Sequence, residues 1–276
     1  MMAVGGRHTE GVRASTSVVA TVAERLAVAG CVAADEEADE LVAAAPDEGV
    51  LDTWIRRRER GEPLAWITGT TLFCGRRLRV DPGVYVPRYE TEELARRAAA
   101  RLREAVASGG RGPARAGDLC TGAGAVAAHL ASAVPGAAVV GVDVDPGAVT
   151  CARRNGVAAV RGDLDAPLRS GAFDVVTAVA PYVPRRDIGF LPADVRRYEP
   201  RRALDGGDDG LDVVRRVVGG AARLLRTGGW LLVEVGGHQD ELLAPSLTAA
   251  GFAAPVAWRD EDGDLRGIAA RLRAAR

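Results

Sequence analysis

The spacing of hydrophobic positions changes about a quarter of the way along the chain. Before that point apolar residues recur at helical spacing, as Val18, Val22 and Leu26 do at intervals of four. Gly30 and Pro46 stand where such runs end. The pattern predicts helices from near 15 to 30, over 33–45 and over 48–60. Connections this short are typical of an antiparallel helical bundle.

A different pattern follows. Residues 72–86 alternate apolar and polar positions around Asp81-Pro82-Gly83, which predicts a β-hairpin that turns there. Beyond it strands alternate with helices, which predicts an α/β fold with a doubly wound parallel sheet. Two last apolar runs flank a polar turn and predict a terminal antiparallel hairpin. The expected strands are 116–120, 138–143, 158–161, 173–178, 230–235, 255–258 and 267–272, and the expected helices are 91–106, 123–134, 146–155, 210–225 and 239–250.

These patterns divide the chain into four parts. We expect a disordered tail over 1–14, a helical domain over 15–70, a linking β-hairpin over 71–87 and the α/β domain over 88–276. The run Arg56-Arg57-Arg58-Glu59-Arg60 is interpreted as a solvated helix end.

Composition narrows the classes of function. Hydrophobic residues make up 47%, and no apolar run is long enough to cross a membrane or resembles a signal peptide. The four cysteines are scattered, which argues against a metal site and for the reducing cytoplasm. A net charge of −1 gives no electrostatic case for direct binding of nucleic acid. None of the 36 basic residues is lysine, which excludes lysine-based chemistry.

Acidic residues follow three successive predicted strands. Asp118 begins a glycine-rich turn, Asp143 ends the second strand and Asp163 follows the third. A carboxylate after the second strand suits the two hydroxyls of a ribose, and Asp163 is placed to accept from an adenine amino group. Each acid alone is more often a solvated loop residue, but the series favours a nucleoside pocket. Its expected members are Asp118, Cys120, Thr121, Gly122, Gly124, Asp143, Val144, Asp163 and Leu164.

The turn itself favours S-adenosylmethionine (SAM) over a dinucleotide. A dinucleotide needs three glycines that bring its pyrophosphate to a helix N-terminus, and the third glycine position here is Ala127. Asp118 is better explained by a ligand that carries an ammonium group, as the methionine end of SAM does.

Several further segments follow one another in an unbroken order, at 61–69, 73–75, 86–92, 118–124, 179–182, 198–204, 210–212 and 234–236. In these segments the chain resembles the protein-(glutamine-N5) methyltransferases, the HemK/PrmC-like enzymes that methylate the glutamine of the Gly-Gly-Gln loop of release factors. The resemblance covers about residues 53–271 and implies the class I SAM-dependent methyltransferase fold, with a helical domain that binds the acceptor.

The resemblance also implies the catalytic strand end, Val179-Ala180-Pro181-Tyr182, and an acceptor that is a release-factor-like protein. The segment that precedes the α/β domain is expected to border the acceptor entrance. The expected acceptor-binding residues are Tyr85, Pro87, Arg88, Glu90, Thr91 and Tyr182.

One departure from the family concerns the chemistry directly. The family reads Asn-Pro-Pro-Tyr at this strand end, and Val179 stands in the place of the asparagine. An amide nitrogen is a poor nucleophile that must be held in place, and valine offers no hydrogen-bond acceptor for its N–H. A smaller departure is Cys120, where the family has glycine.

Three classes of function therefore stay open. The first is a glutamine methyltransferase that tolerates Val179. The second is a SAM-dependent enzyme with a different acceptor, either a small molecule or SAM itself, as in a cyclisation. The third is an inactive relative that binds SAM or a partner protein.

Overall fold

The computed structural model describes residues 16–109, 112–253 and 255–273. The predicted tail over 1–14 lies outside the described residues. The chain divides into two compact units, with the boundary between Gly69 and Thr70. Within the described residues, no helix is both long and apolar enough to cross a membrane.

The first unit is helical. The three predicted helices are confirmed as α1 (Thr16–Val28), α2 (Ala34–Ala44) and α3 (Glu48–Glu59), and a short α4 (Leu64–Thr68) follows Pro63. Sequence periodicity missed α4 because five residues are too few to show a helical repeat. One apolar core joins the four helices, and its members include Leu26, Leu41, Ile55 and Ile67.

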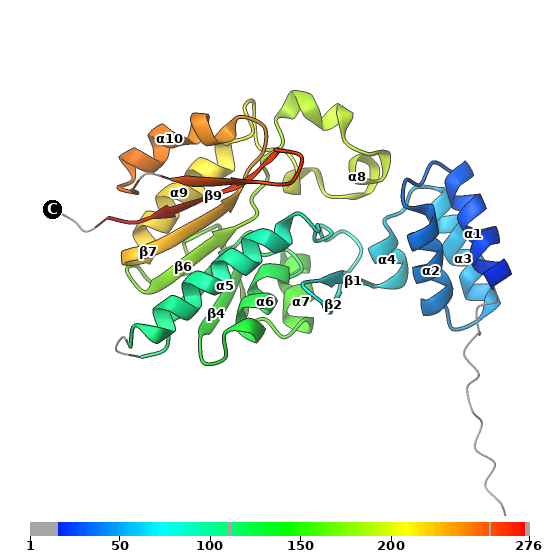
Figure 1. The fold of residues 1–276 in the computed structure, drawn as a ribbon, viewed down its shortest axis with the longest axis horizontal. Helices are drawn as coiled ribbons and strands as arrows, with labels where there is room; N and C mark the ends of the chain where they lie inside the picture. The colour runs from blue at the N-terminus through cyan, green and yellow to red at the C-terminus, as the bar shows by residue number, and fades with distance from the viewer. Residues whose placement is uncertain (1–15, 110–111, 254, 274–276) are drawn as a thin grey trace, which may run out of the picture. The chain divides into compact units, whose positions relative to one another are not determined.

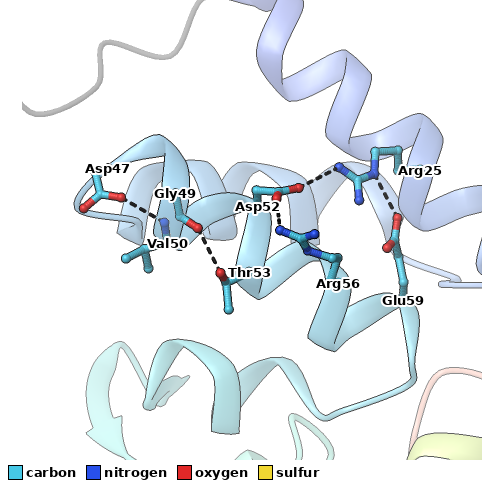
Figure 2. A network of polar contacts seen from close by, with 8 residues as sticks. All are labelled: Arg25, Asp47, Gly49, Val50, Asp52, Thr53, Arg56 and Glu59. Carbon is cyan, nitrogen blue, oxygen red and sulfur yellow. Dashed lines mark hydrogen bonds and ion pairs between the residues drawn. The ribbon is translucent and has the colours of Figure 1, made fainter.

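Figure 2 shows the polar contacts that tie α1 to α3. The Asp47 carboxylate accepts from the backbone N–H of Val50 at 2.8 Å and so caps the N-terminus of α3. On α1, the Arg25 guanidinium donates to Glu59 at 2.8 Å and to Asp52 at 3.5 Å, both on α3. Arg25 therefore links α1 to two residues of α3 that lie about two helical turns apart.

The arginine run at the end of α3 is solvated only in part. Arg56 and Arg60 are exposed, as that interpretation has it, but it was wrong for Arg57 and Arg58. Arg58 is only 8% exposed and donates twice to Glu37 of α2, at 2.6 and 2.9 Å. Arg57 donates to Glu62 at 2.8 Å. Sequence periodicity treats every arginine as polar surface, whereas a guanidinium can be buried when a carboxylate meets it with two hydrogen bonds.

The second unit opens with a hairpin of β1 (Thr70–Phe73) and β2 (Arg76–Arg79). Its turn is formed by Cys74 and Gly75, which both have positive φ, as a tight two-residue turn requires. The chain also turns at Asp81-Pro82-Gly83, where the N–H of Val84 donates to the carbonyl of Asp81 at 3.1 Å, but this turn does not join the two strands. The predicted place of the hairpin turn was wrong, because period-two alternation runs through both positions and does not say where the strands reverse. Phe73 is 1% exposed and belongs to the core of this second unit.

A seven-stranded sheet follows, in the order β5-β4-β3-β6-β7-β9-β8. The strands from β5 to β7 are parallel, and β9 runs antiparallel to both β7 and β8. The predicted doubly wound sheet with a terminal antiparallel hairpin is confirmed. The strands are β3 (Arg115–Leu119), β4 (Ala138–Asp143), β5 (Ala159–Arg161), β6 (Phe173–Ala178), β7 (Leu225–Glu234), β8 (Val256–Arg259) and β9 (Leu265–Arg271).

Helices cover both faces of this sheet (Figure 1). One face packs against α5 (Thr91–Ala107), α6 (Ala125–Ala133) and α7 (Pro146–Arg154), and the other against α9 (Asp212–Leu224) and α10 (Gln239–Ala249). A long connection between β6 and α9 holds three short pieces that the sequence did not predict. They are η1 (Arg185–Phe190), α8 (Ala193–Tyr198) and η2 (Arg201–Ala203).

Candidate active site

A cavity of about 590 Å³ lies at the carboxyl ends of the parallel strands, and every residue that lines it belongs to the second unit. This is the edge at which ligands bind in open α/β sheets. The structure brings the predicted site residues together around this one cavity, with the exception of Gly124.

Asp118 lies at the end of β3 and is almost completely buried. Its two carboxylate oxygens accept from the hydroxyls of Thr121, at 2.6 Å, and Thr177, at 2.7 Å. Burial raises the pKa of Asp118 to about 6, although these hydrogen bonds favour the charged form. Asp118 therefore links the turn after β3 to the neighbouring strand β6 as well as bordering the cavity.

The turn after β3 needs positive φ at Cys120, Gly122 and Gly124. This requirement explains why glycine is usual at position 120 and why cysteine there adopts a disfavoured conformation. Gly122 lines the cavity, whereas Gly124 faces α7. A Cβ at Gly124 would lie 2.9 Å from Val157 Cγ2 and 3.0 Å from Ala152 Cβ. Gly124 thus permits close packing of the turn on α7.

Asp143 ends β4 beside this turn. The backbone N–H of Gly122 donates to one carboxylate oxygen at 2.8 Å, and the N–H of Asp145 donates to the other at 2.9 Å. Burial raises the pKa of Asp143, and these two bonds oppose that effect. Because each carboxylate oxygen has a second lone pair, Asp143 can accept two more hydrogen bonds from a diol in the cavity.

Two ion pairs at the cavity were not predicted. Asp163 is exposed and binds Arg216 of α9 at 2.7 Å, and Asp145 binds Arg202 of η2. All four residues line the cavity. Arg202 lies in one of the segments that carry the family resemblance, which was a usable signal. Nothing in the sequence around Arg216 distinguishes it from the other arginines of α9.

The segment after β6 forms an apolar wall of the cavity. Val179 is partly buried and packs against the main core, and Ala180 is 3% exposed. Tyr182 turns its hydroxyl toward the end of β7, where it donates to Glu234 Oε1 at 3.0 Å. The hydroxyl of Thr91 donates to Glu234 Oε2 at 2.6 Å. Sequence reasoning quoted Glu234 only as part of a motif and gave it no role.

The segment that precedes α5 borders the part of the cavity around Val179, Tyr182 and Glu234, which is called the acceptor half below. The Arg88 guanidinium lies 4.9 Å from the centre of the Tyr85 ring and forms an ion pair with the buried Glu199. Burial raises the pKa of Tyr85 to about 12. Pro87, Glu90 and Thr91 also line the cavity, so the predicted acceptor-binding residues lie together.

Comparison with known proteins gives the class of chemistry. Residues 117–198 match the model of a methyltransferase domain. The chain is 38% identical over 224 residues to a release factor glutamine methyltransferase of Geobacter sulfurreducens, across 79% of this chain and 76% of the relative. It is 42% identical over 194 residues to a 4-amino-L-phenylalanine/4-methylamino-L-phenylalanine methyltransferase of Streptomyces pristinaespiralis, across 67% of this chain and 65% of the relative.

Among solved structures, the crystal structure of the hMettl16 catalytic domain in complex with MAT2A 3'UTR hairpin 6 is similar with a TM-score of 0.54. The sequence identity is 14%, over 84% of this chain and 81% of that one. This likeness supports the methyltransferase fold alone.

Proposed function

This chain belongs to the family of release factor glutamine methyltransferases, and we propose that it methylates an amine nitrogen of a small molecule rather than the glutamine for which the family is named. The chain is a SAM-dependent methyltransferase. SAM supplies a methyl group activated by its positively charged sulfur. The remaining question is how this chain's residues hold SAM and which nitrogen they present to it.

The residues after β3, β4 and β5 fit SAM. Asp143 keeps lone pairs free for the ribose hydroxyls, and Gly122 leaves the backbone open to a ligand at the turn. Val144 is a large apolar side chain that is 54% exposed at the cavity, and an adenine ring in the pocket would cover it. Leu164 lines the same region, and the Asp163 carboxylate can accept a hydrogen bond from the adenine amino group. The methionine end then lies toward Cys120, Thr121 and Asp118.

The single observation that carries the choice of acceptor is the apolar wall at Val179. A carboxamide brings two N–H donors and a delocalised lone pair, so it must be held by two hydrogen-bond acceptors. We expect the backbone carbonyl of Ala180 to supply one, and the side chain of Val179 supplies none. An N–H left without a partner there would cost about 1–3 kcal/mol. An amine has a more available lone pair, so it does not need two acceptors to orient it for attack on the methyl group, and a secondary amine also brings one N–H fewer.

Two further observations support an amine acceptor on a small molecule. Tyr85, Pro181 and Tyr182 give this half of the cavity the apolar, partly aromatic lining that is usual in small-molecule sites. The Streptomyces relative is named for a reaction on an arylamine, 4-amino-L-phenylalanine, and on its methylamino derivative.

Turnover of SAM with two kinds of acceptor tests the proposal. The wild-type chain is incubated with SAM and either 4-amino-L-phenylalanine and related amines or a release factor that carries Gly-Gly-Gln. We expect methylated amine and little methylated release factor. The Val179→Asn variant should gain activity on the release factor and lose activity on amines. Efficient wild-type methylation of the glutamine, without a gain from asparagine, would refute the amine acceptor.

Family membership favours a second candidate, methylation of that same glutamine. An ordered water can replace a lost side-chain oxygen at small cost. In that case Val179→Asn changes the rate on the release factor little, and amines are not turned over.

A further inference from the structure

Glu234 is a carboxylate at the acceptor half of the cavity without an assigned task. It is the last residue of β7, is 3% exposed and lines the cavity. Tyr182 and Thr91 each donate one hydroxyl hydrogen bond to it, at 3.0 and 2.6 Å. These two bonds fix the orientation of the carboxylate with one hydrogen bond on each oxygen.

The carboxylate has capacity for another partner. Each carboxylate oxygen accepts up to two hydrogen bonds, so Glu234 retains a lone pair on each oxygen. Arg266 of β9 acts on Glu234 as a positive charge, and Glu90, which precedes α5, acts as a negative one. The neighbouring hydroxyls of Tyr85 and Tyr182 are held uncharged by burial, which raises the pKa of both.

We propose that Glu234 accepts a hydrogen bond from the acceptor nitrogen and receives the proton that this nitrogen loses on methylation. The inference rests on the proposed amine acceptor. The nitrogen lone pair forms the new bond to the methyl carbon, the bond from that carbon to sulfur breaks with its electron pair left on sulfur, and the N–H proton passes to the carboxylate.

Electrostatics supports this placement. Methyl transfer moves positive charge from the sulfur to the nitrogen, so a buried carboxylate beside the nitrogen stabilises the charge where it develops. Two other carboxylates that line the cavity are less suited to accept this proton. Asp118 already accepts two threonine hydroxyls at the SAM turn, and Glu90 is exposed to solvent, where its charge is screened.

The test compares Glu234→Gln with a matched Glu104→Gln control, because Glu104 is an exposed residue of α5 outside the cavity. The measured quantity is kcat/KM against pH for 4-amino-L-phenylalanine. The amino group on the aromatic ring of this compound is uncharged at neutral pH. Glu234 acts only when ionised, so wild-type activity falls as pH drops through its pKa, which burial raises. We expect Glu234→Gln to lose about 100-fold in kcat/KM and to lack this acidic limb.

Two further measurements separate the proposed task from a structural one. Thr91→Val removes a hydrogen bond that favours the charged form of Glu234, so it should move the acidic limb to higher pH. Calorimetry should show that the dissociation constant of Glu234→Gln for SAM is within twofold of the wild-type value. In the presence of the demethylated product of SAM, the same variant should bind the amine more weakly than the wild type does.

The outcomes are distinct. A Glu234→Gln variant with the wild-type rate and the wild-type limb overturns this inference and leaves the amine acceptor standing. Loss of SAM binding in that variant assigns Glu234 a structural task and overturns it as well. A wild-type chain that binds SAM but neither binds nor methylates any amine overturns the proposed function, and this inference falls with it.

Discussion

At the scale of single residues, two glycines of one turn serve different ends. Both have positive φ, yet only Gly122 borders the cavity, and only Gly124 lies against α7. The sequence assigned both to the cofactor, since a glycine-rich turn does not reveal which glycine approaches the ligand and which approaches a helix.

Alanine at each position separates these roles. Gly124→Ala adds a Cβ that meets Val157 and Ala152 in a strained conformation, so we expect a loss of about 3 kcal/mol in the free energy of unfolding. Gly122→Ala meets no neighbour and should lose only about 1 kcal/mol, but it should weaken SAM binding. Urea unfolding and calorimetry measure the two effects. Equal losses of stability would show that the contact with α7 is unimportant.

The buried Asp118 predicts a pH dependence of stability in the cofactor-free protein. Its pKa rises from an ordinary 3.8 to about 6 on folding, so the folded state holds its proton more tightly than the unfolded state. Below about pH 4 both states are protonated and nothing is lost. Stability then falls as pH rises, by about 3 kcal/mol once pH exceeds about 6. Asp118→Asn should lack this loss, which urea unfolding from pH 4 to 7 measures; identical slopes would refute the assignment.

The residue scale also shows the reach of the sequence. The sequence placed Asp143 at the end of one strand and Val179 just after another, and both lie there, because a strand end is fixed by the periodicity of the strand before it. Arg202 and Arg216 were not predicted because their ion pairs with Asp145 and Asp163 join residues far apart in the chain, although Arg202 lies in a segment that carries the family resemblance.

At the scale of elements, the order of helices and strands in the second unit followed from periodicity, but two features did not. Alternation predicted the first hairpin and misplaced its turn, because Cys74 reverses the chain in a conformation that sequence rules assign to glycine or asparagine. The arginines of α3 looked like surface residues, because a buried ion pair with α2 is invisible in either helix alone.

The pair of Arg58 and Glu37 gives an element-scale prediction. Glu37→Ala removes the carboxylate that pairs with the buried Arg58 guanidinium. It should lower the free energy of unfolding of the helical unit by about 3 kcal/mol. Replacing both residues, as in Glu37→Ala with Arg58→Met, should recover part of the loss because no charge remains buried. Urea unfolding followed by tryptophan fluorescence, to which Trp54 and Trp66 of the helical unit contribute, measures both. A double variant less stable than the single one would contradict this reasoning.

At the scale of the whole molecule, the class I methyltransferase fold and its cofactor were accessible from sequence, because motifs preserved in order specify an architecture. The acceptor was not accessible, because it depends on side chains from β7, β9 and the segment before α5 that meet only after folding. Every side chain around the cavity comes from the second unit, between Gly83 and Arg266. We therefore expect residues of the second unit to hold an acceptor that is small enough to enter this cavity.

Truncation tests this conclusion. A chain that begins at Thr70 keeps the hairpin, whose Phe73 and Leu78 are buried in the core of the second unit, and should bind SAM with wild-type affinity. It should also methylate small amines, whereas a protein acceptor that needs the helical unit would no longer be turned over. A chain that begins at Val86 loses both core residues. It should unfold at lower temperature, since deleting a buried phenylalanine or leucine costs about 2–5 kcal/mol each. Calorimetry with SAM, thermal unfolding by circular dichroism and amine turnover measure the three quantities. If the Thr70 chain is folded and binds SAM but methylates no amine that the full chain methylates, the helical unit takes part in acceptor binding and the conclusion is refuted.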